Sequence, residues 1–226
     1  MIIIFDLDDT LYDELSFVYS GFRAVSKHLN KTLLVNETDV YLFMVNELRE
    51  NGRGKVFDKT IVNFFGKSNK RLVRELLSVY RKHKPDIFIS EEVESILSKL
   101  SKEYKLYLVT DGNLNTQRNK IKSLNLSKYF VKCIPTRNFG LDAEKPSMKV
   151  FEYIRKKENC SSKIMYIGDN PRKDFFAVNS MGGITCLLRT GCYSSENIRK
   201  TLYKPAHKFD NISDWFHWFT KEKFIK

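Results

Sequence analysis

A short apolar segment followed at once by paired aspartates is the feature that most constrains the fold of this chain. Met1–Phe5 is rich in β-branched residues, which is typical of a strand buried on both faces of a parallel sheet. Asp6 and Asp8 come next, so both carboxylates are expected at the carboxyl edge of that sheet, where open α/β sheets bind ligands. Acidic groups gathered there are costly to bury unless a cation or a chemical task holds them. A polar turn is the alternative interpretation, and later parts of the chain decide between the two.

Three later stretches have the same character, because each places polar residues at a predicted strand end or in a loop before a helical pattern. They are Leu106–Val109 ending in Thr110, Asp111 and Gly112; the pair Lys145 and Pro146; and Ile164–Ile167 ending in Gly168, Asp169 and Asp174. Four such stretches in one chain favour a ligand site over an isolated polar turn.

In their order, these stretches resemble the motifs of the haloacid dehalogenase (HAD) superfamily, from Asp-x-Asp-x-Thr to Gly-Asp-x-x-x-x-Asp. The match runs from Met1 to about Arg189, and four motifs together are far more specific than one. The resemblance implies an α/β fold: a Rossmann-like parallel sheet with helices on both faces and an inserted α-helical cap domain. It also implies a hydrolase. Dehalogenases generally lack the second aspartate of the signature, so Asp8 favours the phosphatase branch.

The resemblance implies catalytic roles for four residues. Asp6 would attack phosphorus and form an aspartyl-phosphate, which divides a slow hydrolysis into two easier steps. Asp8 would protonate the leaving oxygen and later take a proton from the attacking water. Thr110 would donate a hydrogen bond to the phosphoryl group, and Lys145 would neutralise both that group and Asp6.

Two backbone N–H groups would complete the phosphate site, those of Asp111 and Gly112, where glycine permits a close approach. The family usually has asparagine after the threonine, and this chain has Asp111. A further carboxylate beside a phosphate is unfavourable, so only the backbone role is carried over to this position. We expect its side chain to point away from the phosphate.

The resemblance also implies a Mg²⁺ site, since this ion prefers oxygen ligands in octahedral geometry. Its residues would be Asp6, the backbone carbonyl of Asp8, Asp169 and Asp174. Asp169 would bind the ion directly. Asp174 would more readily orient metal-bound water or the Lys145 ammonium, and Asn170 and Pro171 are predicted to begin the helix that carries it.

The long interval between Asp6 and Thr110 predicts an inserted domain, because a direct β-α-β connection needs only roughly 30 residues. Apolar residues recur there at helical spacing, with a break at Asn51–Gly54. We therefore expect a catalytic core over residues 1–12 and 89–226 and a helical cap, of the family's type 1, over residues 13–88. The core should continue as alternating strands and helices, with helices over 147–158 and 173–181.

The net charge of +12 raises nucleic acid as a partner. The charge is spread over both predicted domains and not gathered into one stripe, so we expect a small phosphorylated metabolite instead, either a sugar phosphate or a nucleoside monophosphate. A phosphomutase has the same nucleophile and acid–base pair and stays an alternative. A non-catalytic phosphate-binding module is a second one.

Membrane insertion and secretion are not expected. No apolar run approaches the roughly 20 residues of a membrane span, and the aspartates end the first apolar run too early for a signal peptide. The cysteines form no Cys-x-x-Cys pair, which favours a reduced, cytoplasmic protein; they are Cys133, Cys160, Cys186 and Cys192. The sequence gives no indication of the oligomeric state.

Overall fold

A computed structural model describes residues 1–158, 163–193, 196 and 198–222. The chain divides into two compact units, one of Met1–Glu14 with Phe88–Lys226 and the other of Leu15–Ile87. Cys160 lies outside the described residues, and Cys133, Cys186 and Cys192 are free thiols. Among the helices described, none is long and apolar enough to cross a membrane.

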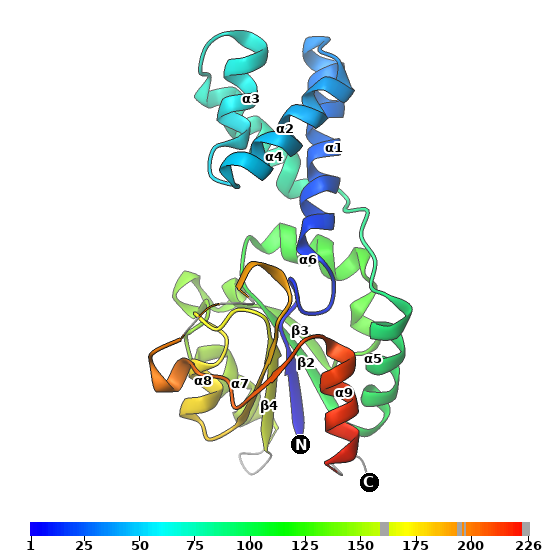
Figure 1. The fold of residues 1–226 in the computed structure, drawn as a ribbon, viewed down its shortest axis with the longest axis vertical. Coiled ribbons are helices and arrows are strands. Elements are labelled where there is room, and N and C mark those ends of the chain that lie inside the picture. The colour runs from blue at the N-terminus through cyan, green and yellow to red at the C-terminus, as the bar shows by residue number, and fades with distance from the viewer. Residues whose placement is uncertain (159–162, 194–195, 197, 223–226) are drawn as a thin grey trace. The chain divides into compact units, whose positions relative to one another are not determined.

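The first unit is built on a six-stranded sheet in the order β3-β2-β1-β4-β5-β6, and every neighbouring pair is parallel (Figure 1). The strands are β1 (Ile2–Phe5), β2 (Lys105–Thr110), β3 (Lys132–Pro135), β4 (Ile164–Gly168), β5 (Ile184–Leu188) and β6 (His207–Phe209). β1 is fully buried at the centre of the sheet, as its unbroken apolar run predicts.

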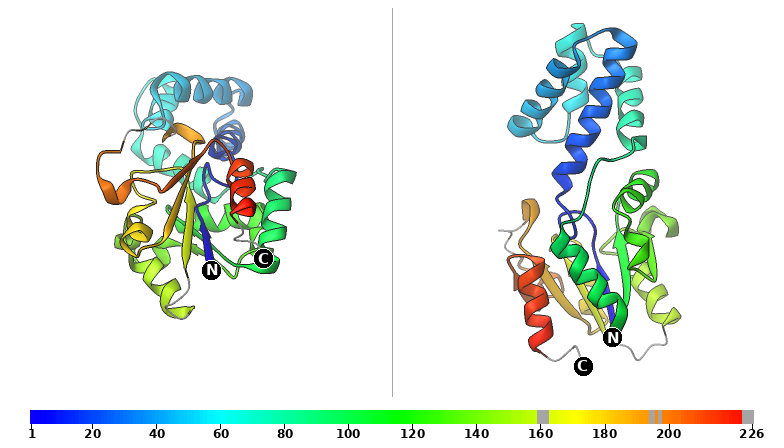
Figure 2. Two further views of the ribbon diagram at one scale, coloured as in Figure 1. Left: turned by 60° about the horizontal axis from the view of Figure 1, so that its bottom comes forward. Right: turned by 90° about the vertical axis from the view of Figure 1, so that its right-hand side faces the viewer.

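Helices cover both faces of this sheet, as the views in Figure 2 show. They are α5 (Glu91–Glu103), α6 (Leu114–Ser123), α7 (Lys149–Lys157), α8 (Phe176–Ser180) and α9 (Ile212–Lys221). On one face, Ile2 and Ile4 share a core with residues of α7 and α8. On the other, the ring of Phe5 meets that of Trp215 in α9 edge-on at 5.5 Å. Alternate residues of β1 thus serve opposite layers, and the predicted α/β class is confirmed.

The second unit is helical and has its own hydrophobic core, which includes Val18, Phe22, Met44 and Leu76. It contains α2 (Glu37–Asn51), α3 (Val56–Phe65), α4 (Lys70–Lys82) and nearly all of α1 (Glu14–Leu33). Asn36 and Asn69 begin α2 and α4 by accepting hydrogen bonds from backbone N–H groups of the first turn. Gly52 ends α2 with a φ of 72°, a conformation that favours glycine.

Two predicted helix starts are wrong. α8 begins at Phe176, so Asp174 precedes the helix that it was expected to join, and α7 begins at Lys149 and not at the predicted residue 147. The reason is clear for α8: the Asp174 carboxylate accepts a hydrogen bond from the Asn170 N–H at 2.9 Å. That bond closes a turn over residues 170–174 and places the aspartate at the strand end.

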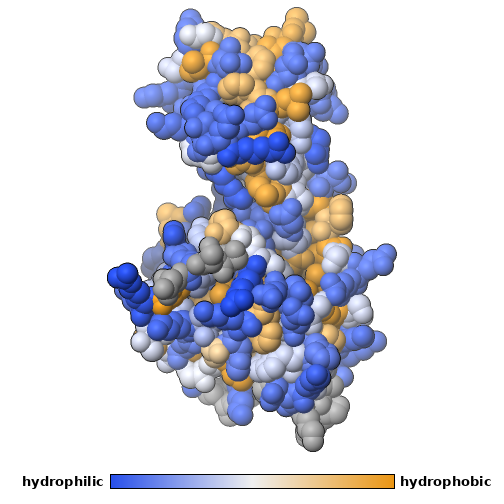
Figure 3. Space-filling model, viewed as in Figure 1, coloured by the Kyte–Doolittle hydropathy of each residue, from blue (hydrophilic) through white to orange (hydrophobic). Residues whose placement is uncertain are grey.

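The surface of both units is largely hydrophilic on the face that Figure 3 shows, and hydrophobic residues lie there singly or in small groups. Leu34, Phe88 and Leu141 are among the exposed large hydrophobic residues, and they are far apart in the sequence. Scattered exposure of this kind is normal for a folded protein.

Candidate active site

The candidate site lies at the carboxyl ends of three adjacent strands, β2, β1 and β4. Phe5 is in register with Leu108 of β2 and with Ile167 of β4. The Asp6 N–H continues the ladder and donates to the Ile167 carbonyl at 2.9 Å. The pairing therefore brings together the ends of three segments that are far apart in the sequence.

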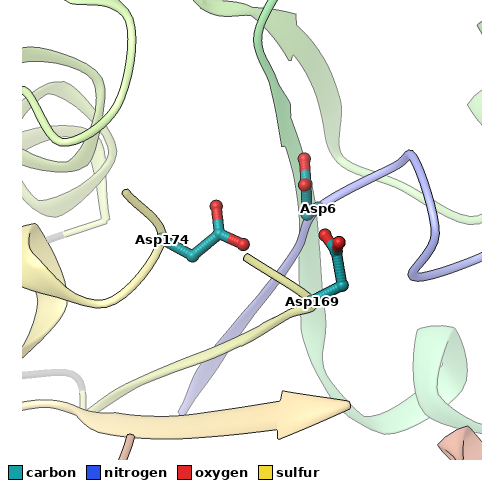
Figure 4. A group of neighbouring side chains, drawn as sticks. All are labelled: Asp6, Asp169 and Asp174. Atoms are coloured by element: carbon teal, nitrogen blue, oxygen red, sulfur yellow. The ribbon is translucent and has the colours of Figure 1, made fainter. Parts of the chain in front are cut away.

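Three buried carboxylates, those of Asp6, Asp169 and Asp174, form the centre of the site (Figure 4). Each offers one oxygen, and these oxygens lie within 4.8 Å of one another. Burial, with added repulsion from neighbouring carboxylates, raises the pKa of Asp6 to about 7 and that of Asp169 to about 9. An all-oxygen donor set that repels itself in this way suits a hard divalent cation such as Mg²⁺, so the residues present fit the ion that the resemblance implies.

Asp174 differs from Asp6 and Asp169 because both of its carboxylate oxygens already accept hydrogen bonds. One oxygen accepts hydrogen bonds from Lys145 Nζ at 2.7 Å and from the Tyr166 hydroxyl at 3.2 Å, and the other accepts from the Asn170 N–H. Gly168 leaves space for this carboxylate, since a Cβ there would lie 2.5 Å from Asp174 Oδ2. This arrangement favours Asp174 as the residue that holds the lysine over Asp174 as a direct metal ligand.

Lys145 is completely buried, and its ammonium lies 2.9 Å from Asp6 Oδ1. It also contacts Asp174 and the Tyr166 hydroxyl, the latter at 2.8 Å. Burial alone would lower the pKa of Lys145, but Asp174 and Asp6 outweigh it and hold that pKa well above its ordinary value. The site therefore contains a fixed positive charge beside the predicted nucleophile.

The side chain of Asp8 belongs to a separate group. Its carboxylate accepts hydrogen bonds from the Tyr12 hydroxyl at 2.6 Å, Lys120 Nζ at 2.6 Å and Gln117 Nε2 at 3.1 Å. Burial would raise the pKa of Asp8, but Lys120 and these hydrogen bonds hold it below its ordinary value. The predicted metal role of Asp8 concerned its backbone carbonyl, and the side chain is accordingly outside the group of three carboxylates.

Thr110 and Gly112 lie at the end of β2. The Thr110 hydroxyl is buried and accepts a hydrogen bond from Gln117 Nε2 at 2.5 Å. Gly112 has a φ of 126°, which a side chain would strain. Both residues lie where the phosphate-binding loop was predicted, between the strand end and the start of α6.

The carboxylate of Asp111, the departure from the family pattern, bridges three other segments. It accepts hydrogen bonds from the Thr136 hydroxyl at 2.8 Å, the Lys145 N–H at 3.1 Å and Lys173 Nζ at 3.0 Å. Although burial opposes ionisation, Lys145 and Lys173 hold the pKa of Asp111 below its ordinary value. The extra negative charge is thus paired within the protein.

Sequence analysis missed six residues whose side chains contact the predicted site residues: Tyr12, Gln117, Lys120, Thr136, Tyr166 and Lys173. Gln117 and Lys120 carried one usable signal. The sequence of α6 has few apolar residues, so the buried face of this helix has to include polar ones. No sequence signal pointed to Thr136 and Lys173, because their partner, Asp111, follows a different strand.

Comparison with known proteins identifies the family. The family model described as haloacid dehalogenase-like hydrolase matches residues 3–187. The glyceraldehyde 3-phosphate phosphatase of Methanocaldococcus jannaschii is 26% identical, over 84% of this chain and 86% of that protein. The human N-acylneuraminate-9-phosphatase is 25% identical, over 67% of this chain and 66% of that protein.

Solved structures share the fold. A HAD hydrolase of Bacillus subtilis bound to magnesium superposes with a TM-score of 0.67 at 17% identity, covering 96% of this chain and 97% of that one. A 2-haloacid dehalogenase of Pseudomonas syringae gives a TM-score of 0.64 at 20% identity and covers 98% of each chain. These similarities extend over both units of the chain.

Proposed function

Because the chain belongs to the haloacid dehalogenase-like hydrolase family, as its motifs indicated, we propose that this HAD-type phosphatase is a Mg²⁺-dependent phosphomonoester hydrolase acting through an aspartyl-phosphate on Asp6. The observation that carries the proposal is the buried lysine–carboxylate centre at the end of β1. There, Lys145 Nζ lies 2.9 Å from Asp6 Oδ1, with Asp169 and Asp174 beside it. A nucleophilic carboxylate needs such a cation to approach a phosphate dianion without prohibitive repulsion.

The chemistry proceeds in two displacements at phosphorus. In the first, an Asp6 oxygen bonds to phosphorus, the ester P–O bond breaks, and Asp8 gives a proton to the leaving oxygen. Asp8 has to take up that proton before this step, because its contacts in the free protein favour the ionised carboxylate. In the second, ionised Asp8 takes a proton from water while the water oxygen bonds to phosphorus and the acyl-phosphate P–O bond breaks. Asp6 is then free again and inorganic phosphate leaves.

The remaining residues hold the phosphoryl group in place. Thr110 and the backbone N–H groups of Asp111 and Gly112 would donate to its oxygens, and Lys145 would offset its charge. When bound, Mg²⁺ would offset charge between the nucleophile and the phosphate, held by Asp6, Asp169 and the Asp8 carbonyl. Asp174 acts by fixing Lys145, which its hydrogen bond at 2.7 Å supports.

The substrate in this proposal is a small phosphorylated sugar or sugar derivative. The names of two relatives support the class, since one acts on a triose phosphate and the other on a phosphorylated sialic acid. We further propose that the helical unit Leu15–Ile87 serves as the cap that contacts the non-reacting part of the substrate. The division of the chain after Glu14 and before Phe88 supports an insertion between the first two motifs.

The test is phosphate release from a panel of sugar phosphates and nucleoside monophosphates, with and without Mg²⁺. Asp6→Asn is the variant and Asp210→Asn the matched control, because the Asp210 side chain is 75% exposed. Mg²⁺-dependent release that only Asp6→Asn abolishes supports the proposal. Normal release by Asp6→Asn refutes the nucleophile. Turnover that requires a bisphosphate primer would identify a phosphomutase instead.

A further inference from the structure

We propose that Gln117 and Lys120 of α6 are positioning residues that aim the Asp8 carboxyl at the leaving group, and that their effect on rate depends on how much the leaving group needs a proton. The inference rests on the proposed function, because it assumes that Asp8 is the acid–base group. It assigns roles to two residues that none of the motifs contains.

The first argument is geometric. Lys120 Nζ lies 2.6 Å from Asp8 Oδ1, and the Lys120 side chain is only 3% exposed. Gln117 Nε2 donates to Asp8 Oδ2 at 3.1 Å, so the two α6 residues hold different oxygens of one carboxylate. The Tyr12 hydroxyl adds a further bond to Oδ1 at 2.6 Å. A carboxyl held at both oxygens has little freedom to rotate.

The second argument concerns the polar residues on the buried face of α6. Its buried residues are Thr116, Gln117, Lys120 and Ile121, so most of its inner face is polar. Lysine is rarely buried unless it is paired, and a buried ion pair is often no more stable than apolar residues of similar volume. Core packing therefore does not explain Gln117 and Lys120, whereas a fixed Asp8 does.

The third argument is the second hydrogen bond of Gln117. Its Nε2 also donates to Thr110 Oγ1 at 2.5 Å. Because the threonine oxygen accepts this bond, its own hydrogen is available to another acceptor, such as a phosphoryl oxygen of the proposed substrate. One amide therefore fixes both the phosphate-binding hydroxyl and the acid–base carboxyl, which sets the distance from the phosphate to the proton donor.

These contacts act in the first displacement. As the ester P–O bond breaks, the Asp8 O–H bond breaks and an O–H bond forms on the leaving oxygen. The carboxylate that appears is stabilised by the Lys120 ammonium and by the two neutral donors. A p-nitrophenolate leaves without a proton, whereas an alkoxide requires one. The two kinds of ester therefore separate positioning of the acid from general damage to the site.

The experiment compares kcat/KM for glyceraldehyde 3-phosphate, an alkyl ester, and p-nitrophenyl phosphate in the wild-type protein with Mg²⁺ and in Lys120→Met. We expect the variant to lose about tenfold or more on the alkyl ester, part of the roughly 10²–10⁴-fold that a positioned acid contributes, and a few-fold at most on the aryl ester. Lys120→Arg should recover part of the loss. Lys122→Met is the matched control, since Lys122 is exposed on the same helix.

Tyr12→Phe keeps the test valid if Lys120→Met does not fold. This variant removes one hydrogen bond to the Asp8 carboxylate without removing a charge. It should lower kcat/KM for the alkyl ester about two- to tenfold. Equal losses on both esters, or no loss in either variant, would overturn the positioning roles. A wild-type protein that hydrolyses neither ester would instead refute the proposed function itself.

Discussion

Replacing Lys145 by methionine should strongly destabilise the protein, by an amount that depends on pH and Mg²⁺. Methionine fills a similar volume but removes an ammonium that is completely buried between Asp6 at 2.9 Å and Asp174 at 2.7 Å. Removing one partner of a buried ion pair leaves an uncompensated charge, and this typically costs about 3–5 kcal/mol of the free energy of unfolding. In Lys145→Met, the three carboxylates of Asp6, Asp169 and Asp174 are left to repel one another without the ammonium.

The sign of the pH dependence follows from that repulsion. Without the ammonium, the pKa values of Asp6 and Asp169, which burial already raises, rise further above those of the unfolded chain. The folded state then binds more protons than the unfolded state at intermediate pH, so its stability falls as pH rises. The destabilisation should therefore be larger at pH 8 than at pH 5, and Mg²⁺ should reduce it at pH 8 by replacing part of the lost charge.

Urea unfolding of Lys145→Met and the wild type at pH 5 and pH 8, each with EDTA or Mg²⁺, measures these differences. Lys149→Met is the matched control, because Lys149 is 49% exposed in its ion pair with Asp142 and such a pair contributes only about 0–1 kcal/mol. A loss at pH 8 no greater than that of the control, or a larger loss at pH 5 than at pH 8, would refute the reasoning.

Three further predictions concern the same strand ends. Asp169→Ala should raise the Mg²⁺ concentration for half-maximal activity at least about tenfold, because it removes a direct ligand; unchanged metal dependence would exclude that role. Asp111→Asn should keep kcat within about threefold and lower stability by about 1 kcal/mol, since an amide oxygen still accepts from Thr136 and the Lys145 N–H but loses the ion pair with Lys173; a large fall in kcat would mean that the carboxylate itself acts in catalysis. In EDTA, the free energy of unfolding of the wild type should fall as pH rises from about 4 toward 9. The reason is that the folded pKa values of Asp6 and Asp169, about 7 and about 9, exceed their unfolded values. A free energy of unfolding, measured in urea, that increases over this pH range would contradict the prediction.

Much of the fold was predictable because it rests on local signals. The apolar run Met1–Phe5 and the strands before Thr110 and Asp169 have patterns typical of buried parallel strands, and their ends meet as expected. The family membership that these motifs indicated is confirmed. The catalytic and metal roles assigned to the site residues stay predictions, as does the function of the inserted unit as a cap.

The rest of the site depended on contacts that local sequence does not encode. The hydrogen bond from Lys120 to Asp8 joins residues 112 positions apart, and that from Lys173 to Asp111 spans 62. The helix beginning predicted at Asn170 and Pro171 was wrong for a related reason. The side chain of Asp174 bonds to the backbone there, and a tertiary site residue overrides a local helix-start signal.

The central place of β1 has a consequence for how the chain folds as it is synthesised. β1 pairs with β2 and β4, which begin at Lys105 and Ile164, so neither of these two partners exists until long stretches of chain have followed β1. The helical unit Leu15–Ile87 has its own hydrophobic core and can form in that interval. The apolar strand β1 therefore stays unpaired with β2 and β4 while the insertion folds. During this stage of synthesis, aggregation through the unpaired strand competes with folding.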